Sequence, residues 1–551
     1  MSLAQTYKDI KRLKQIANVL FKKELGYFVN KLDLKSHLSL HKKAQVKKFI
    51  KPQESLPQRV RESMEELGGS FVKLGQLLSI RPDLIPEEYI EEFKKLQDSV
   101  KPFPFNQVQA TIESEFKKPI TQIFSHFNKI PIASASVGQV HEARLKTGER
   151  VAVKVQRPKI KELFMTDIDI MHHLAHLIEK HVDGSEKFNP VAIVQEFEKY
   201  TKRELDYIIE SRNINHYREV VQDEKMVVIP KVYKDYTTSK VLTMEFIDGV
   251  KISDIKNFKK LKIKASFLSH TLVRVFVKGV LYHKFFHADP HPGNVLITKD
   301  KKIALLDFGI AGGLSEEFSN KLGFLYFAIV EGNIKDIIDG LIDITDAKDV
   351  DKNALEEDIR DIWSFYYDIS MKEVQFTKFF GGTIDIGRKY NLKFPVQYVL
   401  LLKAMLTTDG VIRKVDPDFN FLTVGKPLFK KYIEEKTSPE YMLSRAKKTL
   451  GEFKDLFVNF PKDARKMMNK FEEKRDNEVF NKDDMKGFTQ EISKTSNRMT
   501  LGIIMAALIL ASALIILSNI PPLVWGLPLY AIVGIIIAGI LFMFFLISMF
   551  K

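Results

Sequence analysis

The order of apolar and polar positions changes several times along the chain, and each change predicts a different kind of element. Residues 55–125 carry apolar side chains at helical spacing between prolines, and helical spacing returns at 190–220 and over most of 252–450. Two β-rich runs, 137–145 and 151–155, are separated by a Lys-Thr-Gly-Glu turn signal. Shorter strands are predicted at 226–232, 240–246, 294–298 and 302–307. The pattern predicts an α+β protein in which a small β-rich region precedes a larger helical one.

The C-terminal region has a different pattern, because residues 499–550 contain no Asp, Glu, Lys or Arg. Prolines divide this run into apolar stretches near 500–518 and 529–549. About 20 apolar residues in a helix can cross a bilayer, so the run predicts a transmembrane hairpin. Basic residues flank it on both sides, which predicts a multi-pass protein of the cell membrane with its main body on the cytoplasmic side. A buried helix pair is the alternative.

Positive charge is concentrated at the N-terminus. The chain has 551 residues, with 85 Lys and Arg against 70 Asp and Glu, and residues 1–52 hold 13 basic and three acidic residues. Apolar residues recur among these lysines at helical spacing, which is typical of a basic amphipathic helix lying on an anionic membrane. A solvated helical face explains the charge equally well. Nucleic acid is not expected as a partner, because no recognition motif accompanies the basic residues.

Composition narrows the class of protein. Hydrophobic residues at 45% and charged residues at 28% are ordinary values for a globular chain and exclude a disordered or collagen-like one. The absence of Cys excludes a disulfide scaffold, a thiolate metal site and a Cys nucleophile. The predicted segments are a basic amphipathic segment (1–52), a helical extension (53–125), a β-rich lobe (126–250), a helical lobe (251–450), a charged helical linker (451–499) and two transmembrane helices (500–551).

Three clusters carry candidate chemistry for phosphoryl transfer. Lys154 follows an apolar strand pattern and points to the face opposite its valine neighbours, where it could bind phosphates. Asp289, with His287 before it and Asn294 five positions after it, has the spacing of a kinase catalytic loop. Asp307 begins an Asp-Phe-Gly sequence that could hold Mg²⁺. The three clusters in this order predict a protein-kinase-like fold with two lobes.

Each cluster alone has a plainer explanation. A Lys at the end of an apolar strand is usually a surface residue. Asp-Phe-Gly is an ordinary loop sequence, and His287 with His291 could instead be a metal pair, although no third ligand is suitably placed. The loop Ala133–Gln139 has alanine and serine where protein kinases have glycines, and no Ala-Pro-Glu sequence follows Asp307.

These departures and motifs together resemble those of the UbiB family of atypical kinase-like proteins, over about Leu67–Asn420. Ser134 differs from the family pattern, which usually has a run of alanines in this loop. The motifs that carry the resemblance are Lys73-x-Gly75-Gln76, Ala133–Gln139, Lys154, Glu204-x-Asp206, His287-x-Asp289 with Asn294, and Asp307-Phe308-Gly309.

The resemblance implies roles for individual residues at an ATP site. Lys154 would contact the phosphates and pair with Glu210, while Asn294 and Asp307 would carry Mg²⁺ and Asp289 would stand at the catalytic-loop position. A second group would surround the nucleotide. Lys73 and Gln76 would fold over the cleft, with Lys73 held by Glu204 or Asp206, the loop residues Ala133, Ser134, Ala135, Ser136 and Val137 would line the nucleotide, and Glu245 would lie at a hinge that meets adenine.

The resemblance also implies a function: a membrane-anchored ATPase that supports isoprenoid-quinone biosynthesis of the ubiquinone type. Its partners would be ATP, a quinone precursor or membrane lipid, and an assembly of biosynthetic enzymes. Two alternatives stay open at this point. One is a kinase for a protein, lipid or small molecule, and the other is a non-catalytic scaffold that uses nucleotide as a conformational ligand.

Overall fold

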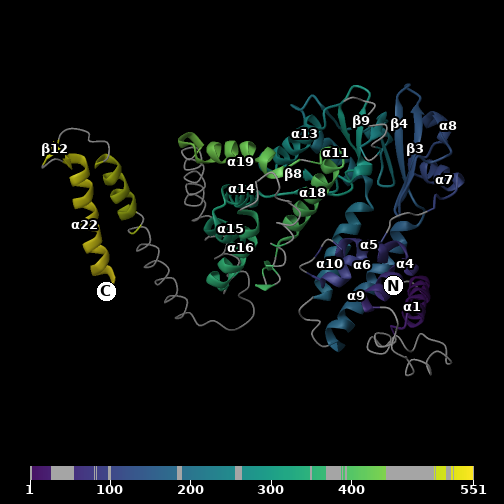
Figure 1. The fold of residues 1–551 in the computed structure, drawn as a ribbon, viewed down its shortest axis with the longest axis horizontal. Coiled ribbons are helices and arrows are strands. Elements are labelled where there is room, and N and C mark those ends of the chain that lie inside the picture. Colours follow the sequence, from purple (N-terminus) through teal and green to yellow (C-terminus); the bar gives the residue numbers. More distant parts are fainter. Residues whose placement is uncertain are drawn as a thin grey trace, which may run out of the picture. The chain divides into compact units, whose positions relative to one another are not determined.

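The computed structural model describes residues 3–25, 55–96, 101–182, 189–254, 263–367, 382–441 and 502–549, apart from short gaps inside these ranges (Figure 1). The predicted linker at 451–499 lies outside the described residues. The chain forms two compact units, residues 1–441 and 442–551. Every candidate site residue belongs to the first unit.

The first unit contains both helices and strands. Its helices are α1 (Leu3–Lys22), α4 (Leu56–Leu67), α5 (Gly69–Leu78), α6 (Glu87–Phe93), α7 (Phe105–Phe116), α8 (Ile120–Ile123), α9 (Ile160–His181), α10 (Pro190–Glu204), α11 (Tyr207–Val220), α13 (Ala265–Lys278), α14 (Glu316–Glu331), α15 (Ile334–Thr345), α16 (Lys352–Tyr367), α18 (Val396–Arg413) and α19 (Phe421–Thr437). Its strands are β1 (Phe124–Phe127), β2 (Ala133–Ser134), β3 (Gly138–Leu145), β4 (Arg150–Gln156), β5 (Val227–Val228), β6 (Val241–Glu245), β7 (Gly249–Lys251), β8 (Phe285–His287), β9 (Val295–Thr298), β10 (Ile303–Leu305) and β11 (Ala311–Gly313).

The β-rich lobe is built on an antiparallel sheet with the strand order β1–β3–β4–β6. Strand β2 pairs with Gln139 and Val140 near the start of β3. The two β-rich runs predicted around the Lys-Thr-Gly-Glu turn form the β3–β4 hairpin. Val151, Val153 and Val155 are fully buried on one face of β4, against a core that includes Val108 and Ile112 of α7. The alternation of strand side chains therefore places Lys154 on the other face.

The helical lobe surrounds the short strands that position the remaining candidate residues. Its large core joins α13, α14, α18 and α19, and Leu268, Val273 and Phe421 are among its fully buried side chains. β8 pairs with β11 so that His287 lies opposite Ala311, and β9 pairs with β10. These pairings bring the segment around Asp289 next to the segment around Asp307. The predicted α+β fold is confirmed.

Helix α9 falls in a stretch for which the apolar pattern predicts no element, yet it organises the N-terminal extension. In Figure 1, α1 and α4–α6 gather around α9 and α10. Asp167 of α9 is fully buried and binds Arg12 of α1, with Nε–Oδ1 and Nη2–Oδ2 distances of 2.7 and 2.9 Å. Ser70 of α5 donates a hydrogen bond to the same carboxylate. One buried carboxylate thus connects α1, α5 and α9.

Part of the apolar side of the N-terminal helix packs against other helices of the first unit. Ile16, Ala17 and Val19 of α1 are at most 5% exposed and belong to clusters formed mainly with α4, α5 and α9. Burial of these side chains against other helices stabilises the position of α1 by the hydrophobic effect. These three side chains are therefore covered by other helices of the first unit, whereas Ile10 near the start of α1 is 42% exposed.

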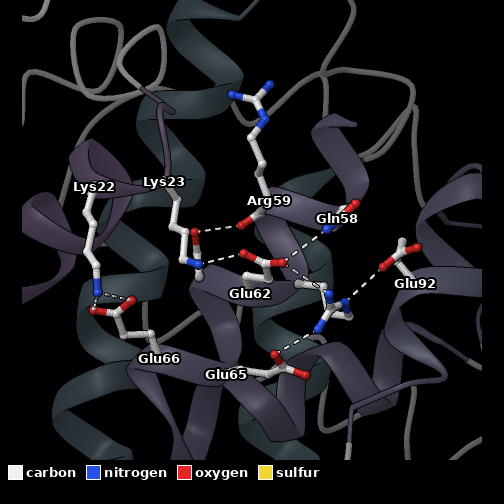
Figure 2. A network of polar contacts seen from close by, with 10 residues as sticks. Lys22, Lys23, Gln58, Arg59, Glu62, Glu65, Glu66 and Glu92 are labelled. Carbon is white, nitrogen blue, oxygen red and sulfur yellow. Dashed lines mark hydrogen bonds and ion pairs between the residues drawn. The ribbon is translucent and has the colours of Figure 1, made fainter. Parts of the chain in front are cut away.

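Part of the N-terminal positive charge is paired with acidic residues of α4, as Figure 2 shows. Nζ of Lys22 lies 3.0 Å from Oε1 of Glu66, and Nζ of Lys23 lies 2.5 Å from Oε2 of Glu62. Arg61 links α4 to α6 through Glu92, with an Nε–Oε2 distance of 2.8 Å. The pair of Lys22 and Glu66 is largely exposed, and such a pair contributes little to stability. The main consequence of these pairs is that the basic side chains have acidic partners within the protein.

The second unit contains a short hairpin of β12 (Leu523–Val524) and β13 (Leu527–Pro528), followed by α22 (Leu529–Met549). The side chains of α22 are described only as far as Met543. Crossing a bilayer requires about 20 consecutive apolar residues. Among the residues that the structure describes, no helix meets the length and hydropathy required of a membrane span. This finding contradicts the predicted transmembrane hairpin and the predicted multi-pass location in the cell membrane.

Candidate active site

Lys154 stands at the centre of the candidate site. Strand β4 directs its side chain toward α11, where its Nζ lies 2.9 Å from both carboxylate oxygens of Glu210. The same Nζ lies 3.6 Å from Oδ1 of Asp307, in the segment that follows β10. The exposed fractions of the Lys154 and Glu210 side chains are 17% and 4%, whereas that of Asp307 is 49%. A buried ion pair therefore lies beside a more accessible carboxylate.

The charges of these three groups shift one another's pKa values. Burial raises the pKa of Glu210 to about 7, although Lys154 opposes that shift. Burial would lower the pKa of Lys154, but the charges of Asp307 and Glu210 overcome it and hold that pKa well above its usual value. Lys154 is the main cause of the lowered pKa of Asp307, assisted by a hydrogen bond from the Gly309 N–H. Lys154 and Asp307 are accordingly both charged at neutral pH.

Asp307 is held by an unusual backbone conformation. Its φ of 55° lies in the left-handed region, which is uncommon for a residue other than glycine. Its Oδ1 accepts a hydrogen bond from the N–H of Gly309 at 3.2 Å. Phe308 is fully buried, with its ring centroid 5.2 Å from that of Tyr217 and 4.7 Å from that of His287. The buried phenylalanine anchors the turn, while Asp307 is left half exposed beside Lys154.

His287 orders the segment that carries Asp289. Its Nδ1 accepts a hydrogen bond from the Asp289 N–H at 3.1 Å, so its Nε2 carries the proton that is donated to the carbonyl of Leu306 at 3.1 Å. Both ring nitrogens are therefore engaged, and burial lowers the pKa of this imidazole. His291 accepts a hydrogen bond from the Gly293 N–H through its Nδ1. The alternative of a metal pair formed by His287 and His291 has no support in this geometry.

Asn294 lies in the same loop as Asp289 and next to the Asp307 segment. Its Nδ2 donates to the Asp289 carbonyl at 3.5 Å, and its own carbonyl accepts a hydrogen bond from the Leu306 N–H at 2.8 Å. Asn294 and Asp307 are thus connected through adjacent strands, β9 and β10. The structure also places Lys403 of α18 at the site, with its Nζ 3.3 Å from Oδ1 of Asp289.

The pattern of the sequence assigns no role to Lys403. It is the charged residue in the otherwise apolar run Val399–Met405, and this isolated charge is the signal that could have identified it. The sequence pattern likewise does not indicate that Tyr207 lies next to Lys154. Its ring lies 5.2 Å from Nζ of Lys154, within the range of a cation–π contact.

Helix α5 reaches the site from the N-terminal extension. Lys73 on this helix lies 2.5 Å from Oε1 of Glu204, at the end of α10. The positive charge of Lys73 also contributes to the lowered pKa of Asp307, which places its ammonium group within electrostatic range of that carboxylate. Asp206 instead begins α11, where its Oδ1 accepts a hydrogen bond from the Ile208 N–H. Gln76 donates a hydrogen bond to the Leu96 carbonyl at 3.4 Å and thereby joins α5 to the segment after α6.

The residues predicted to line a nucleotide lie on and beside β2. Ala133 and Ser134 pair with β3, Ala135 donates its N–H to Gly138, and Ser136 and Val137 are buried. The Oγ of Ser134 is buried and makes no hydrogen bond to the described part of the protein. Glu245, the predicted hinge residue, ends β6 with its N–H and Oε2 both bound to the backbone of Lys231.

The donor atoms present at the site fit an ATP-bound magnesium ion. Carboxylate and amide oxygens are the protein ligands that Mg²⁺ uses, and it usually binds one or two of them together with phosphate oxygens and water. Asp307 and Asn294 supply such oxygens, and the orphaned Ser134 hydroxyl could bind an acceptor. Within the described ranges, no group of three or more His, Cys, Asp or Glu side chains could hold a metal ion alone.

Gly138, the first residue of β3, leaves room for Tyr207. A Cβ at position 138 would lie 2.5 Å from the Tyr207 hydroxyl oxygen and 2.5 Å from the Val155 carbonyl oxygen. Because the backbone of β4 cannot move aside freely, we expect Gly138→Ala to lower the free energy of unfolding by about 1–3 kcal/mol. Urea unfolding measures this change. Gly313→Ala is the matched control, since its Cβ would meet no atom within 4 Å, and equal stabilities of the two variants would contradict the prediction.

The two lobes and the site between their strands define a protein of the kinase-like class with an α+β fold. Models of three families match the chain: the ABC1 atypical kinase-like domain over residues 95–340, the UbiB helical domain over residues 359–420, and the ABC1/UbiB kinase-like C-terminal domain over residues 483–551. The three matched segments do not overlap and follow one another along the chain.

Individual proteins are similar over most of the chain. The "Probable protein kinase UbiB" of Pseudomonas putida is 34% identical over 70% of this chain and 72% of its own length. An uncharacterized protein of Synechocystis is 35% identical over 67% of this chain, which spans 63% of that relative. The solved structure of the Rv3197–erythromycin complex from Mycobacterium tuberculosis has 22% identity and a TM-score of 0.48, covering 66% of this chain and 93% of that one. The chain belongs to the UbiB family of atypical kinase-like proteins.

Proposed function

We propose that the protein binds ATP with Mg²⁺ at this site and hydrolyses it slowly, in support of isoprenoid-quinone biosynthesis. The observation that carries the proposal is the convergence of Lys154, Glu210 and Asp307 from three separate segments, with distances of 2.9 and 3.6 Å. Phosphoryl transfer requires a cation for the phosphates, a carboxylate that holds this cation and a second carboxylate for Mg²⁺. Membership of the UbiB family supports the proposed connection to quinone biosynthesis.

Each side chain has a defined task within this proposal. Lys154, oriented by Glu210, donates N–H groups to phosphate oxygens, while Asp307 and Asn294 offer oxygen ligands. Bound Mg²⁺ would neutralise negative charge that develops on the phosphates. Asp289 orients the attacking water and accepts its proton as the bond between the γ-phosphorus and the ADP oxygen breaks. ADP leaves with the electron pair of that bond, and inorganic phosphate is the other product.

The position of α5 favours hydrolysis or a small acceptor over a protein substrate. The ion pair between Lys73 and Glu204 fixes α5 beside the group that contains Lys154 and Asp307. We propose that a helix in this position limits the room for a peptide at the site. The relative from Pseudomonas putida carries the words "probable protein kinase" in its name, and label transfer to protein is accordingly an outcome that the test must distinguish.

The test uses the purified full chain with γ-labelled ATP, with Mg²⁺ or with EDTA. We expect Mg²⁺-dependent release of labelled inorganic phosphate and no label on the protein itself or on proteins of an added extract. Label in a lipid or protein fraction would show that the protein is a kinase and that the proposed hydrolysis is wrong. Nucleotide binding without turnover would support the scaffold alternative, and the absence of Mg²⁺-dependent binding would refute the proposal. Quinone content in cells that lack the protein, with and without restored expression, tests the biosynthetic part.

A further inference from the structure

Helix α18 brings a charged side chain to the candidate catalytic loop. Nζ of Lys403 lies 3.3 Å from Oδ1 of Asp289, and the exposed fractions of the two side chains are 23% and 36%. Its neighbours on α18, Leu402 and Ala404, are buried in the core of the helical lobe. The backbone of Lys403 is therefore fixed by packing, while its ammonium group lies at the site and remains partly accessible.

The loop itself supplies no permanent cation for a terminal phosphate. The sequence from Asp289 to Asn294 contains neither Lys nor Arg, and the imidazole of His291 points its Nδ1 back at the Gly293 N–H. The other two lysines at the site are already held by carboxylates, Lys154 by Glu210 and Lys73 by Glu204. Lys403 is thus the cation that is paired with the candidate water-orienting residue itself.

We propose that Lys403 binds the γ-phosphate of ATP, and that in doing so it releases Asp289 from their ion pair. This inference rests on the proposed function, because it assigns a ligand atom to a side chain of that same site. Asp289 and the γ-phosphate are both anionic acceptors that compete for one ammonium group. The ion pair is partly exposed and therefore weak, and the phosphate carries more charge than a carboxylate, so the exchange favours the phosphate.

The exchange couples the arrival of ATP to the state of Asp289. While Lys403 binds Asp289, the carboxylate oxygen nearest to it is occupied by an N–H donor. Once Lys403 binds the γ-phosphate, that oxygen can accept a hydrogen bond from the attacking water. ADP lacks the γ-phosphate, so Lys403 returns to Asp289 after the phosphate leaves. Lys403 accordingly distinguishes ATP from ADP, and the segment matched by the UbiB helical domain contributes a ligand to the site.

The test measures the dissociation constants of Mg-ATP and Mg-ADP for the full-length protein. We expect Lys403→Met to weaken ATP binding at least tenfold and to change ADP binding less than twofold, whereas Lys403→Arg retains much of the preference for ATP. Lys414→Met removes an exposed lysine at the end of the same helix and should change neither constant. A loss of equal size for both nucleotides, or no loss for either, would overturn the inference.

A second variant tests the exchange without removing the lysine. Because Asp289 competes for Lys403, Asp289→Asn should strengthen ATP binding severalfold and leave ADP binding unchanged. The gain in ATP affinity should disappear in the double variant Asp289→Asn/Lys403→Met. A gain that persists there would show that it comes from the loss of repulsion between Asp289 and the phosphate, and would overturn the proposed exchange. If the wild-type protein bound neither nucleotide, the proposed function itself would be wrong. If the wild type bound both nucleotides and Lys403→Met kept the preference for ATP, only the inference about Lys403 would be wrong.

Discussion

Replacing Asp307 with Asn should abolish Mg²⁺-dependent ATP turnover while the protein stays folded. The side chain is half exposed, and the amide oxygen of Asn can still accept the hydrogen bond from the Gly309 N–H. The lost charge, however, removes an anionic ligand from the proposed metal position. A metal ion at a phosphoryl-transfer site contributes several kcal/mol, so we expect turnover to fall by at least about a hundredfold. Phosphate release at several Mg²⁺ concentrations measures the change.

The matched control for this experiment is Asp300→Asn. Asp300 is an exposed aspartate in the turn between β9 and β10, on the same small sheet but away from Lys154. Its replacement changes the net charge by the same amount and should leave turnover unaltered. Circular dichroism and thermal unfolding establish that both variants are folded. Unchanged turnover in the Asp307 variant would remove the main support for the catalytic assignment.

Local patterns were sufficient to predict the elements that carry the site. The alternation of valines around Lys154 predicted both the strand β4 and the face from which the lysine projects, because strand side chains alternate strictly. The spacing of Asp289 and Asn294 similarly reflects a short loop between β8 and β9. In such segments the conformation follows from neighbouring residues alone.

Other features depend on contacts between distant segments, which no local pattern reveals. Lys403 meets Asp289 across more than a hundred residues, and the isolated charge in the run Val399–Met405 does not indicate which residue it contacts. The left-handed backbone of Asp307 directly precedes the fully buried Phe308, whose neighbours Tyr217 and His287 come from distant segments. The apolar positions of α1 predicted an amphipathic helix correctly but could not show that α9 covers them. Likewise, the absence of charge near the C-terminus predicted a bilayer span that the described residues do not provide.

The N-terminal extension is connected to the site by a chain of direct contacts. Arg12 and Ser70 share the buried carboxylate of Asp167, which fixes α1 and α5 against α9. Helix α5 in turn carries Lys73, whose ion pair with Glu204 sets its place beside Asp307. The position of a side chain at the proposed nucleotide site thus depends on the packing of the first helix of the chain. The extension accordingly belongs to the same compact unit as the site.

Lys154→Met should both abolish turnover and destabilise the protein, with a destabilisation that depends on pH. The substitution leaves Glu210, which is 4% exposed, without the cation that binds both of its oxygens. Removing one partner of a buried ion pair costs about 3–5 kcal/mol when the other group stays charged. We expect a loss of this size in the free energy of unfolding at pH 8, measured with urea.

The sign of the pH dependence follows from the pKa of Glu210. Burial raises this pKa from 4.5 to about 7 in the wild type, and removal of Lys154 takes away the charge that opposes the rise. The folded protein then binds a proton more tightly than the unfolded chain, so the contribution of Glu210 to stability is fully present below about pH 4.5 and is lost as pH rises through its folded pKa. The deficit of the variant should therefore be small at pH 5.5, where Glu210 is protonated, and large at pH 8.

The double variant Lys154→Met/Glu210→Gln separates the two consequences of losing the lysine. It removes both charges and keeps the shapes of the side chains, so most of the stability at pH 8 should return and its pH dependence should flatten. Turnover should not return, because no ammonium group remains to bind the phosphates. An equal loss of stability at pH 5.5 and pH 8 in the single variant Lys154→Met would show that the loss comes from packing and not from the charge of Glu210. Recovery of turnover in the double variant would show that Lys154 serves only to neutralise Glu210, and its proposed contact with phosphate would then be wrong.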